Sequence, residues 1–243
     1  MCTSQIDGRV MRVAHCELSA VDRTWPFVDL NARAIDAHWR LRSAGNPKFF
    51  NGRIHMLASY ELTGDTLRGH CLETGFKEFL YWREHGEPET GVLDVFGSAL
   101  IRSDEGCILL GRQRPGNINT GLAYLPGGFI DPRDVSGDGR IDIAASTARE
   151  AAEETGLDAE HLTRQPGYWL TFHGLQLSIA VEYQCRLPAM ALKDRVMSHL
   201  EADPASELAD VMLVQQPGDL DNLPMAPYAR ALLATLLTPF ENI

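Results

Sequence analysis

The segment IAASTAREAAEET, residues 143–155, restricts the fold of this chain more than any other stretch. Asp142 precedes it and Gly156 follows it, and these residue types favour the N-cap and the left-handed C-terminal end of a helix. At about 100° per residue its small residues gather on one face, namely Ala144, Ala145, Ala148, Ala151 and Ala152. Because alanine is small, we expect a helix whose alanine face lies close against a sheet.

The opposite face of this expected helix carries Glu150, Glu153 and Glu154, at the spacings i, i+3 and i+4. Like charges this close repel one another, so the carboxylates either face solvent or are neutralised by a cation. A hard divalent metal takes oxygen ligands and also binds phosphate oxygens. Arg149 adds a guanidinium that can orient a carboxylate of the same cluster. The residues leave two interpretations open, a solvated acidic face and a metal site.

Upstream of the helix, the segment LPGGFIDPRD supplies a Pro-Gly-Gly turn. Together the two segments resemble the loop-helix-loop motif of the Nudix hydrolases, which runs Gly, five residues, Glu, seven residues, then Arg-Glu-apolar-x-Glu-Glu-x-Gly-apolar. The matching residues are Gly128, Arg149, Glu150, Ala151, Glu153, Glu154, Gly156 and Leu157, with Pro126 and Gly127 as the lead-in. The resemblance extends over roughly residues 93–238.

This resemblance implies an α+β fold, an α/β/α sandwich with a mixed sheet, and a diphosphatase that uses Mg²⁺ or Mn²⁺. It implies that Glu150, Glu153 and Glu154 hold the metal together with the backbone carbonyl near Gly128, and that Arg149 belongs to the catalytic cluster. The implied reaction is attack of a metal-activated water on a diphosphate that joins a nucleoside to a second moiety.

Further candidates for the site lie outside this helix. The resemblance also implies an acid from a later loop that acts as base or ligand, for which the candidates are Glu207 first, then Glu201, Asp203 and Glu182. Arg112 and Arg114, in LLGRQRPG, are candidates for binding substrate phosphate. Salt bridges along an edge strand are an equal explanation for these two arginines.

The loop between the two halves of the motif departs from the family pattern. Asp134 stands where the family has Glu, and 14 residues rather than seven separate it from Arg149. The additional residues lie in DVSGDGRID, residues 134–142, whose spaced acidic side chains resemble a calcium-binding loop. Position 12 of such a loop is Ala145, which supplies no carboxylate. We therefore interpret the segment as an insertion within one metal and phosphate motif, with Asp134, or alternatively Asp138, as a candidate metal ligand.

The pattern of residue types changes near residue 90. We therefore expect an N-terminal α+β extension, residues 1–90, and a Nudix domain, residues 91–243, joined by the linker HGEPETG. In the extension we expect a strand at 9–18, a helix at 29–43, a hairpin of 53–62 with 66–73, and a helix at 75–86. In the Nudix domain we expect strands at 92–103, 106–114, 122–129, 168–172, 175–187 and 207–215, and a final helix at 226–237.

Composition excludes several classes of protein. A net charge of −11 over 243 residues argues against non-specific binding to nucleic acid or an anionic membrane, whereas a bound metal can still bridge acidic side chains to a nucleotide. The five cysteines are scattered without a CxxC pair, so we expect reduced thiols and a cytoplasmic protein. No stretch approaches the ~20 apolar residues that span a bilayer. The expected partner is a small nucleotide-diphosphate compound.

Part of the extension carries a second resemblance. The stretch NPKFFNGRIHML, followed by YWRE, is similar to the extension of Nudix enzymes that split UDP-sugars, so a nucleotide sugar is the first choice of substrate. The aromatic residues of the extension either stack a base, line a homodimer interface or pack in the core, and core packing is favoured. They are Trp25, Phe49, Phe50, Tyr81 and Trp82.

Two other functions are weighed against this one. A coenzyme A diphosphatase is suggested by the spacing of Gly121 before Pro-Gly-Gly, but Asn117 and Asn119 occupy the positions expected to be basic or histidine. A Nudix-fold nucleotide-binding or regulatory protein without hydrolysis is suggested by the altered acid at Asp134. The intact REAAEETG favours an enzyme.

Overall fold

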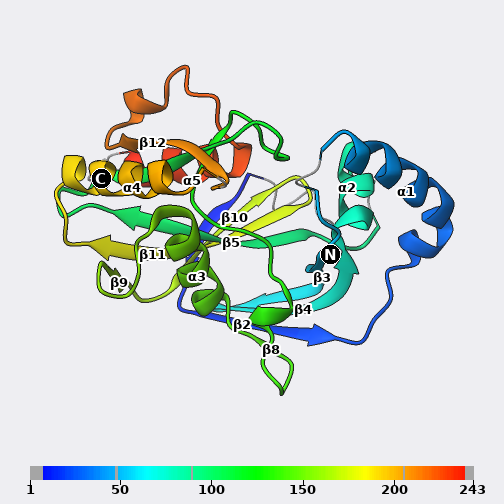
Figure 1. Ribbon diagram of the computed structural model, residues 1–243. Coiled ribbons are helices and arrows are strands. Elements are labelled where there is room, and N and C mark those ends of the chain that lie inside the picture. The colour runs from blue at the N-terminus through cyan, green and yellow to red at the C-terminus, as the bar shows by residue number, and fades with distance from the viewer. Residues whose placement is uncertain (1–7, 47–48, 89, 205, 239–243) are drawn as a thin grey trace.

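The computed structural model describes residues 8–46, 49–88, 90–204 and 206–238, which form two mixed β-sheets (Figure 1). The eight-stranded sheet has the order β1 (Val10–Val13), β10 (Tyr168–His173), β11 (Gln176–Cys185), β5 (Asp94–Arg102), β6 (Ile108–Gln113) and β12 (Leu208–Val214), with β7 (Ala123–Tyr124) beside β6 and β9 (Leu162–Arg164) beside β11. The four-stranded sheet has the order β3 (Arg53–Thr63), β4 (Thr66–Gly75), β2 (His15–Val21) and β8 (Arg140–Ile141).

Strands β5 and β11 pair in parallel at the centre of the large sheet. Successive residues of a strand point to opposite faces, yet Leu100 and Ile101 of β5 are both fully buried, and so are Ile179 and Ala180 of β11. Both faces of these strands are therefore covered, which explains why their sequences are nearly continuous apolar runs.

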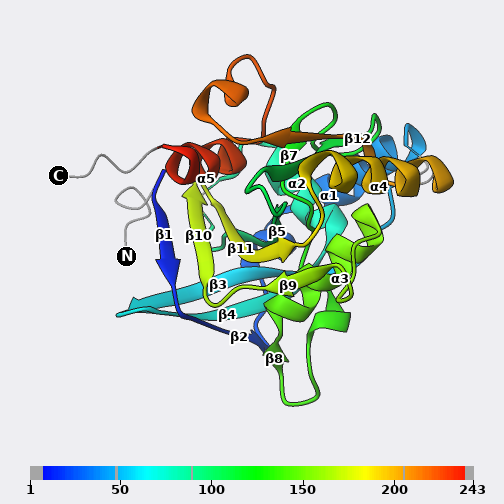
Figure 2. The ribbon, with the colours of Figure 1, turned by 90° about the vertical axis from the view of Figure 1, so that its left-hand side faces the viewer.

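The helices cover the large sheet on both sides, as an α/β/α sandwich requires. Helix α3 (Ile143–Thr155) packs on β5 and β11, α4 (Ala189–Ala202) on β12, and α5 (Pro227–Leu237) on β10 and β1. Figure 2 shows α5 above strands β10 and β11 and α3 to their lower right. The expected fold class is confirmed. Among the described helices, none has both the length and the apolar composition needed to cross a membrane.

Two further helices lie in the N-terminal part of the chain. Helix α1 (Pro26–Ala44) contacts α2 (Phe76–Glu84), and α2 also packs on β4. The helix expected at 29–43 thus begins earlier, because Pro26 occupies its first turn, where a proline needs no N–H partner. The hairpin expected in this part of the chain is formed by β3 and β4.

The bounds of α3 agree with the sequence prediction, and so do its two ends. The Asp142 carboxylate accepts hydrogen bonds from the backbone N–H groups of Ala144 (3.1 Å) and Ala145 (3.0 Å). Gly156 closes the helix with φ = 69°, a left-handed conformation that glycine adopts without strain. Local residue preferences therefore account for where this helix starts and stops.

Helix α4 was not expected. Its buried residues are Ala189, Leu192, Val196 and Leu200, spaced by three, four and four positions. This spacing places them on one helical face, against β12. The same spacing is visible in the sequence AMALKDRVMSHLEA, and it is the signal that would have identified the helix.

The N-terminal extension contributes to both sheets. Strand β1 pairs with β10 along Val10–Val13 and so forms an edge of the large sheet. The small sheet consists of β2, β3 and β4 from the extension together with β8 from the later part of the chain. Leu57 and Leu93 also exchange backbone hydrogen bonds of 2.9 Å. Backbone pairing therefore crosses the boundary expected at residue 90.

The insertion at residues 134–142 forms a short turn that docks on the extension. Ile141 pairs with Leu18 of β2, and the Ala20 N–H donates to the Gly139 carbonyl at 2.8 Å. The insertion appears at the bottom of Figure 1, beside β2 and β4. Its acidic side chain Asp138 accepts a hydrogen bond from the Ser136 hydroxyl at 2.5 Å. The turn is thus closed by its own side chains and anchored by strand β8.

We expect Ile141→Ala to lower the free energy of unfolding by roughly 2–5 kcal/mol, the usual cost of truncating a buried isoleucine. Ile141 is 6 % exposed and packs in the same apolar cluster as Leu18. Arg140→Ala is the matched control, because Arg140 is the exposed neighbour in β8 and its loss should cost less than about 0.5 kcal/mol. Urea unfolding measures the free energy of unfolding of both variants. Equally small decreases in the two would show that β8 does not anchor the insertion.

Candidate active site

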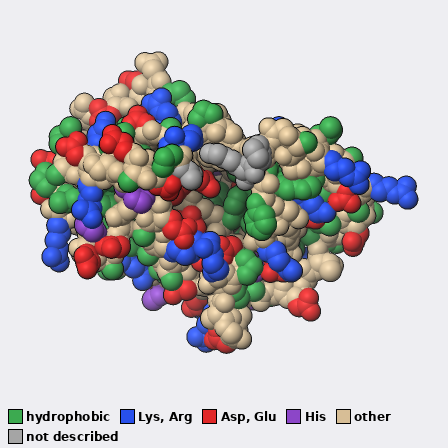
Figure 3. Space-filling model, in the orientation of Figure 1, with side chains coloured by type: hydrophobic (Ala, Val, Ile, Leu, Met, Phe, Trp, Pro, Cys, Tyr) green, Lys and Arg blue, Asp and Glu red, His purple; other side chains and the backbone are tan. Residues whose placement is uncertain are grey.

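A cavity of about 510 Å³ lies beside α3. Its lining comes from the extension, from β5, from the loop with the Pro-Gly-Gly turn, from α3 and from the start of α5. Figure 3 shows a hollow near the centre of one face, with acidic side chains next to hydrophobic ones. The two halves of the acidic motif and the extension therefore meet at one cavity.

In the Pro-Gly-Gly turn, Gly127 has no room for a side chain, and a side chain at Gly128 would displace the end of Glu150. A Cβ at Gly127 would lie 2.2 Å from the carbonyl oxygen of Gly97, and its φ of 155° is one that other residues rarely adopt. A Cβ at Gly128 would lie 2.7 Å from a carboxylate oxygen of Glu150. The turn is thus pressed between β5 and α3, and only glycine allows this approach. The result is that Gly128 and Glu150 lie side by side in the cavity wall.

Only part of the predicted alanine face packs on the sheet, since Ala151 is fully buried and Ala144 packs against the core. Ala145 and Ala148 are exposed, whereas Thr147 is fully buried. The Thr147 side chain packs against Gly97 of β5, where there is no side chain to keep the helix away. On this same buried side Glu154 is only 6 % exposed. The helix therefore turns part of its acidic face inward.

Glu154 is held by two hydrogen bonds inside the protein. Its carboxylate accepts from the Gly127 N–H at 2.8 Å and from the Tyr124 hydroxyl at 3.2 Å. Burial raises the pKa of Glu154 well above its usual value, and the nearby Glu207 carboxylate raises it further, while the two hydrogen bonds oppose the shift. Glu154 is thus a buried carboxyl group whose ionisation is unfavourable, and it is held by two residues that line the cavity, Tyr124 and Gly127.

Arg149 connects the two halves of the acidic motif. Its guanidinium lies 3.0 Å from Asp134, 2.6 Å from Glu150 and 3.4 Å from Glu153. Asp134 also accepts hydrogen bonds from the Ser146 hydroxyl and the Asp131 N–H, each at 3.0 Å. Asp134 is 8 % exposed and is not among the residues that line the cavity. The structure therefore places this expected metal ligand behind Arg149, where its carboxylate is already used.

The other residues of the insertion also use their carboxylates locally. Asp138 is paired with Ser136 and, at 3.4 Å, with Arg140, and Asp142 caps α3. These groups point to different partners, so they do not form a calcium-binding loop in this structure. The alternative that Asp138 reaches the glutamates of α3 has no support from its contacts.

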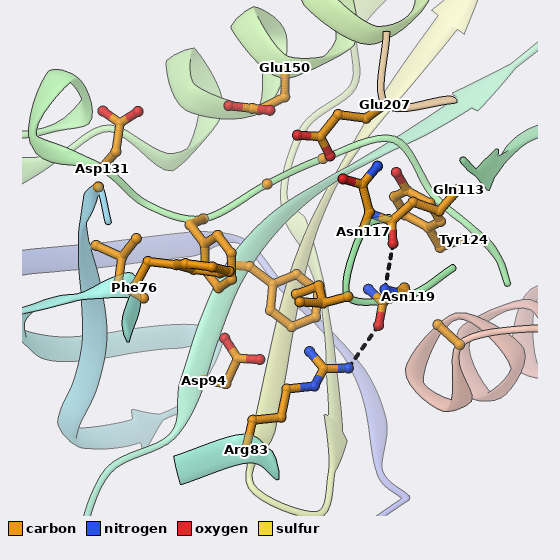
Figure 4. A pocket seen from close by; sticks show the side chains of 18 of the residues that line it. Phe76, Arg83, Asp94, Gln113, Asn117, Asn119, Tyr124, Asp131, Glu150 and Glu207 are labelled. Carbon is orange, nitrogen blue, oxygen red and sulfur yellow. Dashed lines mark hydrogen bonds between the residues drawn. The ribbon is translucent and has the colours of Figure 1, made fainter. Parts of the chain in front are cut away.

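Four of the nine expected site residues line the cavity, and Arg149 and Glu154 contact residues that line it. Glu150, Glu153, Glu207 and Gly128 line it directly. In the close view, Glu150 and Glu207 come from α3 and from the segment before β12, and their carboxylates face the same space (Figure 4). Of these, Glu153 is the most open to solvent among the α3 acids, with a side-chain exposure of 52 %. Glu207, which is distant in sequence, therefore lies at the same cavity as residues of the motif.

Several expected residues are elsewhere. Arg114 donates to the backbone carbonyls of Ser206 (3.0 Å) and Leu208 (2.8 Å), so it fastens the segment that carries Glu207. Arg112 precedes the cavity residue Gln113 in β6 and therefore points to the other face of that strand. The alternatives to Glu207 are not cavity-lining residues either: Glu201, Asp203 and Glu182, the last of which pairs with Arg102 at 2.8 Å.

The cavity contains residues that the sequence prediction missed, one from the extension and one from the start of the Nudix domain. Arg83 of α2 and Asp94 at the start of β5 both line it, although neither belongs to the motif. The available signal was Asp94 itself, an acid inside the apolar run VLDVFGSALI. Among the aromatic residues, Trp82 is fully buried in the core as favoured, whereas Phe49 and Phe50 line the cavity.

The donor chemistry of this cluster fits a hard divalent cation. The carboxylate oxygens of Glu150, Glu153, Glu154 and Glu207 are ligands that Mg²⁺ and Mn²⁺ prefer. Burial, and then repulsion from Glu207, raise the pKa of Glu154, and a bound cation would favour its ionised form. Within the described residues, no group of three or more acidic, His or Cys side chains is already arranged around one point. To bind a metal, Glu150 and Glu153 would therefore give up their contacts with Arg149.

The chain matches a family model and several solved structures. The NUDIX domain model matches residues 93–236, more than half of the chain. RenU, a Nudix hydrolase from M. smegmatis, is 20 % identical, with 58 % of this chain and 82 % of that chain covered and a TM-score of 0.40. DR0079 from Deinococcus radiodurans is 13 % identical, with 77 % and 99 % covered and a TM-score of 0.46. The MutT protein from Methanosarcina mazei Go1 is 23 % identical, with 56 % and 86 % covered and a TM-score of 0.38.

No curated protein matches this chain. The family model covers the cavity-lining turn, the acidic helix α3 and the segment that carries Glu207. These are the parts of the molecule that bring the carboxylates together. The chain belongs to the Nudix family of hydrolases.

Proposed function

We propose that this protein is a metal-dependent diphosphatase that hydrolyses a nucleoside diphosphate linked to a second moiety, with a nucleotide sugar as the first choice. The observation that carries the proposal is the convergence of Glu150, Glu153 and Glu207 at a cavity whose lining also includes seven aromatic side chains. A diphosphate neutralised by a cation fits the acidic end, and a flat organic group fits the aromatic part.

Each cluster residue has a distinct role in this proposal. A divalent cation, when bound, supplies charge stabilisation to the diphosphate oxygens and acidifies water. Glu150, Glu153 and Glu154 provide its carboxylate ligands, and the Gly127 N–H and Tyr124 hydroxyl orient Glu154. Orientation by such partners is what fixes ligand geometry in metal sites.

Glu207 is the proposed general base. It is exposed at the cavity and is carried by the segment that Arg114 fastens to the start of β12. Its carboxylate would accept a proton from the water that attacks phosphorus, while the bond between phosphorus and the bridging oxygen breaks. The products are a nucleoside monophosphate and the phosphorylated second moiety. Arg149 keeps the α3 glutamates in position through Asp134.

The test is phosphate-ester release from a panel of nucleotide sugars and other nucleoside diphosphate compounds with Mg²⁺ or Mn²⁺. We expect turnover that a chelator removes, and we expect Glu153→Gln and Glu154→Gln each to lower kcat by about two orders of magnitude or more. Glu160→Gln, an exposed glutamate just beyond α3, should leave kcat unchanged. A folded wild-type protein that cleaves nothing on the panel would favour the nucleotide-binding alternative.

The raised pKa of Glu154 makes a prediction about stability without metal. Glutamate has a pKa of about 4.3 in unfolded chains, so its folded-state value lies above the unfolded one and its ionisation opposes folding. Below pH 4 the side chain is protonated in both states and has no such effect. As the pH rises through the folded-state pKa, the destabilisation develops.

We therefore expect Glu154→Gln to be more stable than the wild type in a chelator at pH 8, with little difference at pH 4. Each kcal/mol gained should raise Tm by roughly 2–4 °C. Addition of Mg²⁺ should raise Tm of the wild type more than that of the variant. Thermal unfolding at the two pH values measures this, and a variant that is less stable at pH 8 would contradict the strain assigned to Glu154.

The contacts of Asp134 make a separate prediction about the insertion. Asp134→Asn removes the charge that faces Arg149, so we expect kcat to fall by about 10–100-fold with KM little changed, as for partners that orient metal ligands. Asp138→Asn alters the same insertion but not this contact, and its kcat should match the wild type. Steady-state kinetics decides, and the reverse order of effects would assign the positioning role to Asp138.

A further inference from the structure

An apolar stripe runs along the solvent side of helix α1. Leu30 and Leu41 are 83 % and 77 % exposed, and Ala34 and Ala37, which lie between them, are exposed as well. These four residues are spaced by four, three and four positions, so they lie on one side of the helix. Ile35, toward the other side, is buried. The helix thus has one face packed on the protein and a second apolar face turned to solvent.

The position of α1 leaves this second face accessible. Among the described elements, α1 contacts chiefly α2. Figure 1 shows α1 at the right-hand edge of the molecule, outside α2. Contiguous exposed apolar surface marks an interaction site in soluble proteins, whereas single exposed apolar side chains do not. The stripe therefore indicates a surface that binds another polypeptide.

The stripe is complementary to a second copy of itself. Half-buried Phe27 and exposed Ala44 extend it, and the spacings then become three, four, three, four and three, the repeat of helices that pack knobs into holes. This order is the same in both directions. In an antiparallel pair about a two-fold axis, Leu30 therefore lies opposite Leu41 of the second copy, and Ala34 opposite Ala37. The small alanines at the centre allow the two helix axes to approach closely.

A stripe of alternating charges lies beside the apolar one. Its members precede the apolar residues by one position each, about 100° around the helix, and are Asp29, Arg33, Asp36 and Arg40. In the two-fold antiparallel pair the same flanks of the two helices adjoin, so Asp29 meets Arg40 of the second copy with an axial offset of about 3 Å. Asp36 is already paired with Lys77 at 2.7 Å, so the Asp29–Arg40 pairs carry most of this complementarity. Charges on such flanks select the partner and its orientation.

Helix α1 also differs in net charge from the chain as a whole. Its three arginines and two aspartates give it a formal charge of +1, whereas the whole chain carries −11. Two copies repel one another through their acidic surfaces, and α1 is a part of the surface where this repulsion is absent. A single pair of helices buries less than the roughly 1,200 Å² of a standard interface, so we expect a weak and reversible association.

We propose that α1 pairs with α1 of a second copy of this chain, antiparallel about a two-fold axis, with the apolar stripe as the seam and the Asp29–Arg40 pairs on its flank. The aromatic residues of the extension that were considered for a dimer interface are not part of this seam. The inference does not rest on the proposed diphosphatase activity, because it follows from the surface of α1 alone.

Sedimentation equilibrium of the full chain tests the association. We expect a monomer–dimer equilibrium between about 1 and 500 µM. Ala34→Glu places a charge in the middle of the seam and should raise the dimer Kd about tenfold or more. Ala32→Glu is the matched control, because Ala32 is exposed on the same helix away from the stripe, and it should leave the Kd within about twofold. A chain that stays monomeric throughout, or a dimer that Ala34→Glu leaves unchanged, would overturn the proposal.

Both glutamate variants should remain folded, since glutamate is a good helix former and each position is exposed. Thermal unfolding checks this, and the Kd values are compared between variants with the Tm of the wild type.

Thiol cross-linking tests the orientation of the two helices. In the antiparallel pair, Leu30→Cys combined with Leu41→Cys brings thiols face to face, so mild oxidation should link the double variant into a covalent dimer. Each single variant should link no more than the wild type, because the two copies of position 30 are displaced by roughly 16 Å along the axis. Efficient linkage of Leu30→Cys alone, or none of the double variant above the wild type, would contradict the antiparallel pairing.

Discussion

The guanidinium of Arg149 is the contact on which the acidic site depends. It joins Asp134, the first residue of the insertion, to Glu150 and Glu153 on α3. Without the Arg149 guanidinium between them, these carboxylates would repel one another, and the repulsion would push the loop away from the helix. Because Ser146 and the Asp131 N–H also bind Asp134, the pairing is held in one geometry. The residues between Asp134 and α3 can therefore extend away from the motif without separating the two halves of the motif.

A second constraint is the burial of Glu154, which is unfavourable for an ionised side chain without a counterion. Glu154 is buried because α3 approaches β5 closely, where Gly97 leaves room for Thr147. Hydrogen bonds from the Gly127 N–H and the Tyr124 hydroxyl to its carboxylate offset part of the cost of burial. Unfavourable burial of an ionisable group is common at functional sites, where the charges are arranged to bind a ligand. Here it supports the proposed need for a cation.

The extension and the later part of the chain complete the cavity together. Helix α2 brings Arg83 to one end of it, and β5 brings Asp94, while α3 and the segment before β12 bring the glutamates to the other end. Strand β1 joins the large sheet and β8 joins the small one, so the backbone fixes how the two parts meet. The proposed chemistry therefore depends on the arrangement of both sheets.

The sequence by itself determined the acidic helix with its two caps, the Pro-Gly-Gly turn and the family, because these rest on local backbone preferences and on fixed spacings. It also contained the period of α4, although that helix was not recognised. Only the tertiary structure decided which face of α3 is buried, since that depends on Gly97 in a distant strand. It likewise placed Arg112 and Arg114 away from the cavity and brought Asp94 next to Arg83. Such contacts join residues far apart in the chain, and no local pattern of residue types encodes the distance between them.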